Sequence, residues 1–335
     1  MRLAILAHEQ FPGNAKTATG ILRYADDDVV AVLDRDRAGD RVSDHLTGVQ
    51  DAPIVAEMAD VPACDALLIG IAPIGGGFEE SWRADVRVAI ECGCDVIAGL
   101  HYFIAEDEEF AALAAEHGVS LRDVRRPPDD LTVADGTAGE VEARVILTVG
   151  TDCSSGKMTS SFELRDAARE RGLDAAVVPT GQTGIMITGW GIAIDRIIAD
   201  FAAGATERIV QQGGDHDVLF VEGQGAIAHP AYSGVTASIL HGAQPDSLIL
   251  CHNAGNETFG GYDDFALPSP AKYVDLYEDL SAPIAPASVD AGMLNTKGLD
   301  PEEARDAVAA YADAIDVPAT DPVRDDAGDV LDAVL

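Results

Sequence analysis

One segment of the chain combines glycines, a lysine and hydroxyl side chains at the spacing of a phosphate-binding loop. It runs from Gly150 to Thr159, after the apolar run Val145–Val149 and before a helical stretch over 160–171. In such a strand, loop and helix, backbone N–H groups and the helix N-terminus point at an anion, and Lys157 adds a point charge. The pattern predicts a diphosphate site formed by Gly150, Thr151, Asp152, Ser155, Gly156, Lys157, Met158 and Thr159.

The loop departs from the common Gly-x4-Gly-Lys-Ser/Thr pattern in two ways. Five residues separate Gly150 from Gly156, and Met158 stands where a hydroxyl side chain would hold Mg²⁺. The lengthened loop, which begins Gly-Thr-Asp, resembles that of dethiobiotin synthetase and its relatives. Because phosphoryl transfer depends heavily on the metal, the methionine favours a loop that binds a diphosphate without cleaving it.

Two further residues follow predicted strands of the same half. Glu222 ends the apolar run 218–221 and precedes a Gly-rich turn, and Asn295 ends the run 287–294. Open α/β sheets bind their ligands at the carboxyl ends of parallel strands. In proteins of the dethiobiotin synthetase class, which these strand ends resemble, the Glu-Gly serves Mg²⁺ and substrate and the Asn meets the adenine base.

Longer stretches around these residues resemble a two-domain family that was first catalogued as proteins of unknown function. Members of that family are now described as D-glutamate N-acetyltransferases. The resemblance covers nearly the whole chain and implies a Rossmann-like first domain, a P-loop second domain, and acetyl transfer from acetyl-CoA to D-glutamate. It rests on residues 149–153 with 156–159, 180–185, 189–191, 221–225, 229–236, 240–242 and, in the first half, 13–17.

The implied reaction is compatible with these residues. Acetyl-CoA carries a pyrophosphate and an adenine, which the loop and Asn295 could hold without hydrolysis and without a metal ligand after Lys157. The amine of glutamate is protonated at neutral pH, so its attack on the thioester needs a nearby base. Glu222, His229 and Asp217 are the candidates, with Glu222 favoured as the base or amine anchor and His229 as its partner.

The acetyl donor and the acidic substrate also need groups that bind oxygen. Backbone N–H groups around 223–225 or 181–184, or the hydroxyls of Tyr232 and Ser233, could stabilise the developing oxyanion. The substrate carboxylates call for cations in a protein that otherwise avoids positive charge. The expected substrate-binding residues are Lys16, Arg125, Arg126, Gln182, Thr183, Tyr232 and Ser233, although the two arginines are also typical of surface ion pairs.

Two rival hypotheses use the same residues. An ATP- and Mg²⁺-dependent enzyme of dethiobiotin synthetase type, a ligase or kinase, would place Lys157 on the phosphates and use Glu222 and Thr159 at the metal. A nucleotide-sensing protein would bind its ligand without chemistry. If the protein is an acetyltransferase, acetyl-CoA is the co-substrate and no metal is expected.

Composition limits the partners and the setting. The chain holds 58 acidic against 22 basic residues, a net charge of -36, which excludes nucleic acid and anionic membranes as partners. The acids are spread along the chain and lysine is scarce, which indicates a salt-adapted surface and a halophile cytoplasm. The first apolar run, 3–7, is too short for a signal peptide or membrane helix. We expect a small-molecule substrate and a homo-oligomer, the dimer being the commonest assembly.

Apolar runs and amphipathic stretches alternate along both halves, as in βαβ units. Strands are predicted at 3–7, 29–33, 66–72, 95–100, 144–149, 175–178, 218–221, 247–251 and 287–294, and helices at 16–25, 81–92, 106–117, 160–171, 300–314 and 326–334. The predicted fold class is α/β. A Rossmann-like parallel-sheet domain over 1–129 is followed by a linker over 130–143 and a P-loop, dethiobiotin synthetase-like domain over 144–335.

Overall fold

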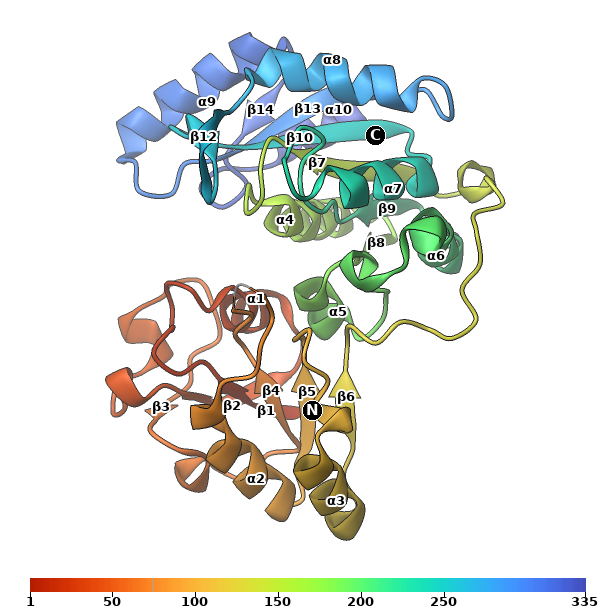
Figure 1. The fold of residues 1–335 in the computed structure, drawn as a ribbon. Coiled ribbons are helices and arrows are strands. Elements are labelled where there is room, and N and C mark those ends of the chain that lie inside the picture. Colours follow the sequence, from red (N-terminus) through yellow and green to blue (C-terminus); the bar gives the residue numbers. More distant parts are fainter. Residues whose placement is uncertain (74) are drawn as a thin grey trace. The chain divides into compact units, whose positions relative to one another are not determined.

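The computed structural model describes residues 1–73 and 75–335. They form two compact units, each built on a six-stranded parallel sheet (Figure 1). The first unit comprises Met1–Pro127 together with Ile185–Arg196, and the second comprises Pro128–Gly184 and Ile197–Leu335. The first unit is therefore discontinuous in sequence, which the predicted ranges 1–129 and 144–335 did not anticipate.

The first unit has the strand order β3-β2-β1-β4-β5-β6. This is the order of doubly wound dinucleotide-binding folds, so the expected Rossmann-like domain is confirmed. Helices α2 and α3 lie side by side (Figure 1). The elements are β1 (Arg2–Leu6), α1 (Lys16–Tyr24), β2 (Asp28–Leu33), β3 (Ile54–Val55), β4 (Ala66–Ile69), α2 (Arg83–Glu91), β5 (Asp95–Ala98), α3 (Glu108–His117) and β6 (Leu121–Asp123).

The second unit has the strand order β14-β13-β10-β7-β9-β8, again parallel, which confirms the second α/β domain. Its elements are β7 (Arg144–Gly150), α4 (Lys157–Glu170), β8 (Ala175–Val178), α6 (Ala199–Gln212), β9 (Val218–Val221), α7 (Ser233–Ala243), β10 (Ser247–Asn253), α8 (Pro270–Ser281), β13 (Ser288–Asn295), α9 (Pro301–Ile315), β14 (Ala319–Thr320) and α10 (Gly328–Val334). Helix α5 (Gln182–Thr188) begins in this unit and ends in the returning segment of the first. A small antiparallel hairpin, β11 (Thr258–Phe259) and β12 (Tyr262–Ala266), was not predicted. Among the described residues, no helix is long and apolar enough to cross a membrane.

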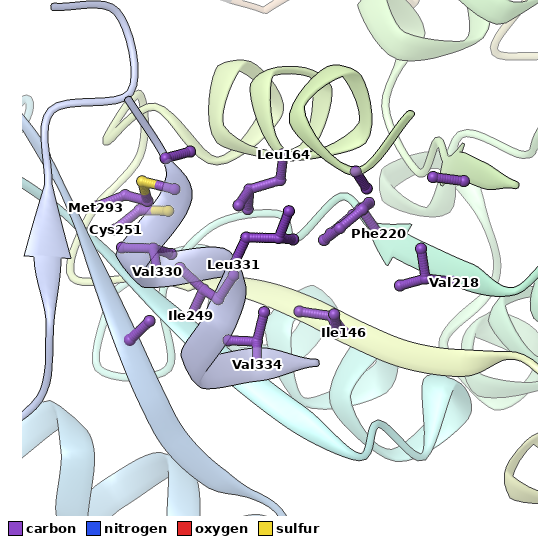
Figure 2. Packing of buried hydrophobic residues seen from close by; sticks show 14 residues of the cluster. Ile146, Leu164, Val218, Phe220, Ile249, Cys251, Met293, Val330, Leu331 and Val334 are labelled. Atoms are coloured by element: carbon purple, nitrogen blue, oxygen red, sulfur yellow. The ribbon is translucent and has the colours of Figure 1, made fainter. Parts of the chain in front are cut away.

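One hydrophobic core of the second unit lies between one face of its sheet and helices α4 and α10 (Figure 2). Alternate strand positions such as Val218 and Phe220 point to the same face because side chains in a strand alternate between its two sides. Leu331 of α10 and Leu164 of α4 are fully buried against them. Truncating a buried phenylalanine to alanine costs about 3–5 kcal/mol. The C-terminal helix is thus part of the core that holds β7 and β9 in place.

The predicted linker, 130–143, is packed onto the second unit. The Glu207 carboxylate of α6 accepts hydrogen bonds from the backbone N–H groups of Asp135 (2.8 Å) and Thr137 (2.7 Å). At Gly204 of the same helix, a Cβ would lie 2.2 Å from the Thr132 carbonyl oxygen, so only glycine allows this close approach. The segment is therefore an ordered part of that unit.

Candidate active site

The predicted loop and strand-end residues of the second unit emerge at one edge of its sheet. β7 pairs with β9 and β10, and β10 pairs with β13. The register sets Gly150 opposite Cys251, and Asn253 opposite Asn295. Because all these strands run parallel, the loop after β7, Glu222 after β9 and the end of β13 share the carboxyl edge. Open α/β sheets bind ligands at this edge.

The loop after β7 is closed around the Lys157 side chain. Lys157 is 7 % exposed, and its Nζ donates to the Asp152 carbonyl oxygen (2.8 Å) and the Ser155 hydroxyl (3.2 Å). Gly156 caps α4 with φ +95°, a conformation that favours glycine. A Cβ at Gly150 would lie 2.6 Å from Ser155 Oγ and 2.7 Å from Lys157 Nζ. Both glycines are therefore required for this loop conformation.

Residues distant in the sequence hold the start of the loop. The Thr151 N–H donates to the Cys251 carbonyl oxygen (3.0 Å), and the Thr151 hydroxyl contacts His252 Nδ1 (2.8 Å), both at the end of β10. The buried Tyr277 hydroxyl of α8 donates to the Gly150 carbonyl oxygen (2.7 Å). The loop is thus fastened from two sides, and neither His252 nor Tyr277 was predicted.

Glu222 sits among glycines that leave room for its carboxylate. It is 4 % exposed, and its Oε2 accepts from the Gly181 N–H at 3.3 Å. A Cβ at Gly184 would lie 2.5 Å from the same oxygen. The Thr180 hydroxyl donates to the Glu222 backbone carbonyl, tying the ends of β8 and β9 together. A buried carboxylate thus lies next to the phosphate loop, since β7 and β9 are neighbours.

Asp152 and His229 form a second buried polar group beside Lys157. The Asp152 carboxylate accepts from the Cys153 N–H (2.6 Å) and the Gly260 N–H (2.9 Å), the latter at the tip of the β11–β12 hairpin. His229 Nε2 lies 3.7 Å from Asp152 Oδ1, beyond hydrogen-bond distance. Burial lowers the pKa of His229; the Asp152 charge opposes this shift and the Lys157 charge adds to it. The ring is therefore neutral at physiological pH.

Aromatic side chains surround His229. Its ring lies 4.7 Å from that of Tyr232, 5.3 Å from that of Phe259 and 5.2 Å from that of Tyr262, measured between centroids. Tyr232 is 48 % exposed, and Ser233, the first residue of α7, is half-buried. Tyr232 and His229, both predicted site residues, are thus in contact. The other two rings around His229 come from the β11–β12 hairpin, which was not predicted.

The remaining predicted residues of this unit lie at the same edge. Asn295 donates from Nδ2 to Asn253 Oδ1 (2.9 Å) and accepts from the Lys297 N–H (3.0 Å). Gln182 and Thr183 begin α5, directly after Gly181, whose N–H contacts Glu222. On α4, Met158 is buried and Thr159 is half-buried.

Asp217 does not join this group. It precedes β9 and therefore lies at the amino edge of the sheet, one whole strand away from Glu222. Its side chain is exposed and accepts from the Asp174 N–H at 2.8 Å. The structure thus argues against Asp217 as a base for the same reaction, because the two ends of a strand serve opposite edges.

Three predicted substrate-binding cations belong to the first unit. Lys16 is exposed at the start of α1. Arg125 is 6 % exposed and forms an ion pair with Asp195 of the segment that returns to this unit. Arg126 pairs with Glu106 at 3.0 Å and covers the ring of Phe103 at 4.6 Å. Both arginines have protein partners, but Arg125 is buried and is therefore not the surface ion-pair residue that the alternative interpretation described.

Comparisons with known proteins agree with the two-unit architecture. Residues 35–127 match a model described as a domain of unknown function, DUF1611_N, Rossmann-like, and residues 132–331 match the DUF1611_C P-loop domain. The chain belongs to the DUF1611 family. A crystal structure of a DUF1611 protein from Anabaena variabilis is 37% identical, covers 99% of this chain and 98% of its own, and superposes with a TM-score of 0.93.

Two relatives of this DUF1611 chain bear the name D-glutamate N-acetyltransferase. The protein from Tritonibacter scottomollicae is 35% identical over 325 residues, which is 96% of this chain and 94% of the relative. The protein from a Pseudoalteromonas species is 34% identical over 259 residues, 77% of each chain. The family resemblance predicted from the sequence is confirmed.

A metal ion at Asp152, Cys153 and His229 fits this DUF1611 site poorly. One ligand atom from each of the three lies within 4.8 Å of the others. His229 Nδ1, however, accepts from the Ala231 N–H (3.1 Å), so the proton of the neutral ring is on Nε2, the nitrogen that would face the ion. Mg²⁺ at the phosphate loop also lacks a ligand, because buried Met158 replaces the usual hydroxyl.

Proposed function

We propose that the protein transfers an acetyl group from acetyl-CoA to the amine of an acidic amino acid, with D-glutamate as the preferred acceptor. The observation that carries the proposal is that two groups lie on neighbouring strand ends. One is the phosphate loop, whose buried Lys157 is followed directly by Met158 and not by a hydroxyl residue, and the other is the buried Glu222 carboxylate. The names of the two relatives supply the reaction and the acceptor.

In this proposal the loop binds the pyrophosphate of CoA. Lys157 turns from the Asp152 carbonyl and the Ser155 hydroxyl to the phosphate, while the N–H groups at the start of α4 complete the anion site. Asn295, at the same edge, is available to the adenine. Because a diphosphate is bound and not cleaved, a metal ligand after Lys157 is not needed.

Glu222 acts on the acceptor amine. The carboxylate takes the proton from the ammonium group, so that the free amine attacks the thioester carbonyl carbon. The Gly181 N–H, which donates to Oε2, fixes the orientation of the carboxylate. Burial of Glu222 keeps water away from the oxygen that receives the proton.

The experiment follows thioester loss in molar KCl. The purified protein is given acetyl-CoA with D-glutamate, L-glutamate, D-aspartate or D-alanine, and free CoA thiol is measured. Thioester loss that requires an acidic amino acid, fastest with D-glutamate, and that survives EDTA would support the proposal. Substrate-stimulated ATP hydrolysis that needs Mg²⁺, without thioester loss, would contradict the proposal and favour the ATP-dependent hypothesis. Tight acetyl-CoA binding without turnover would indicate a sensing protein.

A further inference from the structure

The His229 ring is held in one protonation pattern. A backbone N–H can only donate, so Nδ1, which accepts from the Ala231 N–H at 3.1 Å, carries no proton. Since burial keeps the ring neutral, its single proton is on Nε2. A second proton would have to enter at Nδ1 and break the bond to Ala231. The ring is thus built to donate from Nε2, which argues against the predicted role of His229 as a partner of the base.

This donor has no acceptor in the described part of the chain. The ring is 1 % exposed, and the nearest carboxylate oxygen, Asp152 Oδ1 at 3.7 Å, already accepts from the Cys153 N–H. Leaving a buried donor unpaired costs about 1–3 kcal/mol. Such groups are rare in native proteins and each needs an explanation.

A second unpartnered polar group lies on α8. The Tyr273 hydroxyl is fully buried and has no hydrogen-bond partner within the described residues. Burial raises the pKa of Tyr273, and the charges of Tyr277 and Asp152 raise it further. One helical turn away, the Tyr277 hydroxyl is paired with the Gly150 carbonyl. Two buried groups without partners thus lie within the electrostatic reach of Asp152.

We propose that the His229 Nε2–H is the hydrogen-bond donor to the thioester carbonyl oxygen of the ligand held by the phosphate loop. The inference rests on the proposed acetyl transfer and assigns its oxyanion donor. The donor adjoins the loop, since Asp152 belongs to it and the Lys157 charge acts on the ring. A neutral imidazole can stabilise an oxyanion without transferring its proton.

The proposed transfer begins with deprotonation of the acceptor. Glu222 accepts a proton from the ammonium group, and the amine attacks the carbonyl carbon. As the C–N bond forms, the carbonyl electron pair moves onto the oxygen that accepts from His229. Collapse of the tetrahedral intermediate breaks the C–S bond and releases CoA thiolate, and the second amine proton goes to solvent or to the thiolate.

The tautomer is tested first, without any turnover. Long-range ¹H–¹⁵N spectra of the ¹⁵N-histidine-labelled full chain should show His229 protonated on Nε2 between pH 6 and 8. Adding acetyl-CoA should move the Nε2–H proton resonance downfield, and the shift should be absent in Lys157→Ala. A proton on Nδ1, or an unshifted Nε2–H at saturating acetyl-CoA, would overturn the assignment. These outcomes do not depend on whether the thioester is consumed, which tests the proposed function separately.

Kinetics then separate a donor from a base. His229→Ala should lower kcat by about 10²–10³-fold with little change in KM for acetyl-CoA, as loss of one oxyanion donor does. His229→Gln, which keeps a side-chain N–H, should recover part of the loss and leave the acid limb of the pH profile unchanged. His241→Gln is the matched control, because that ring already contacts the Leu280 carbonyl at 3.0 Å. Loss of the acid limb, or no recovery with Gln in a chain of normal Tm, would contradict the donor role.

Discussion

The two units have comparable parallel sheets but different carboxyl edges. In the first, the Asp34 carboxylate accepts from three backbone N–H groups, and Asp85 accepts from His8, Arg35 and the Met58 N–H. The Asp34 carboxylate is therefore already hydrogen-bonded to the protein's own backbone, which leaves it poorly suited to bind the ribose of a dinucleotide. A single buried ring nitrogen there, Nδ1 of His8, lacks a partner among the described residues.

The second edge instead presents a glycine loop, a buried lysine and, near Asp152, two donors that have no acceptor among the described residues, His229 Nε2–H and the Tyr273 hydroxyl. Both sheets thus have the parallel topology that places ligand sites at the carboxyl edge, while the chemistry depends on which polar groups there have partners in the protein.

Glu222→Gln should have the largest effect on catalysis. It keeps the size of the side chain but removes the basicity, so kcat should fall by about 10² to 10⁴-fold. The residual rate should rise with pH, as free amine becomes available. Asp217→Asn, at the amino edge, is the control and should leave kcat unchanged. If EDTA abolishes the wild-type activity and Mg²⁺ restores it, Glu222 is a metal ligand instead.

Lys157→Ala should weaken binding of the phosphate-bearing ligand. A hydrogen bond to a charged group contributes about 1.5–3 kcal/mol, so KM for acetyl-CoA should rise by roughly 10 to 150-fold. Arginine should restore binding only in part, because its planar group does not replace a point charge. Lys272→Ala, a surface residue paired with Asp275, is the control. An unchanged KM would remove the loop from the mechanism.

Gly184→Ala should disturb the carboxylate without removing it. The added Cβ would lie 2.5 Å from Glu222 Oε2, so the carboxylate has to move. We expect kcat to fall on the order of 10-fold, since small displacements of a reacting group are costly. Gly234→Ala on α7 is the matched control because its Cβ would meet nothing within 4 Å. Equal rates for the two variants would show that the position of Glu222 is not critical.

Asp34→Asn should affect stability and not catalysis. The change weakens three hydrogen bonds to a fully buried carboxylate, so the free energy of unfolding should fall by about 1–3 kcal/mol. KM and kcat, measured well below the Tm, should match those of the wild type. A raised KM for the amino acid would place a substrate contact in the first unit and erase the contrast between the two edges.

Acidification should destabilise the second unit slightly. Burial lowers the pKa of both His229 and His252. Below a pH of about 6.5 the unfolded chain binds more protons at these two histidines than the folded chain does. The folding stability that their neutral rings contribute above that pH is therefore lost as the pH falls. Urea unfolding at pH 7.5 and pH 5.5 measures the loss, which should be smaller in His229→Gln. An equal loss in that variant would show that His229 does not contribute.

Local sequence patterns predicted most of the architecture. The ends of the strands around the loop were predicted to within two residues, because strands of a parallel sheet that are buried on both faces appear in the sequence as continuous apolar runs. The β11–β12 hairpin was missed because its second strand is largely exposed and carries no alternating apolar pattern. The return of Ile185–Arg196 to the first unit was also missed, since unit membership depends on contacts that no local pattern encodes.

The conformation of the phosphate loop and the start of the helix after it follow from the local sequence. Gly156 permits the φ of +95° at the N-cap of α4, and the helix begins at the next residue, Lys157. Which buried polar groups have partners depends on the folded chain. Tyr277 donates to Gly150 across 127 positions of sequence, whereas the Tyr273 hydroxyl has no partner among the residues that the structure describes. The N–H groups of Gly260 and Cys153 donate to Asp152, whose carboxylate lies 3.7 Å from His229 Nε2, so this nitrogen has no hydrogen-bond partner in the described part of the chain. Hydrogen bonding of a buried group depends on distances between distant segments, and these exist only once the chain has folded.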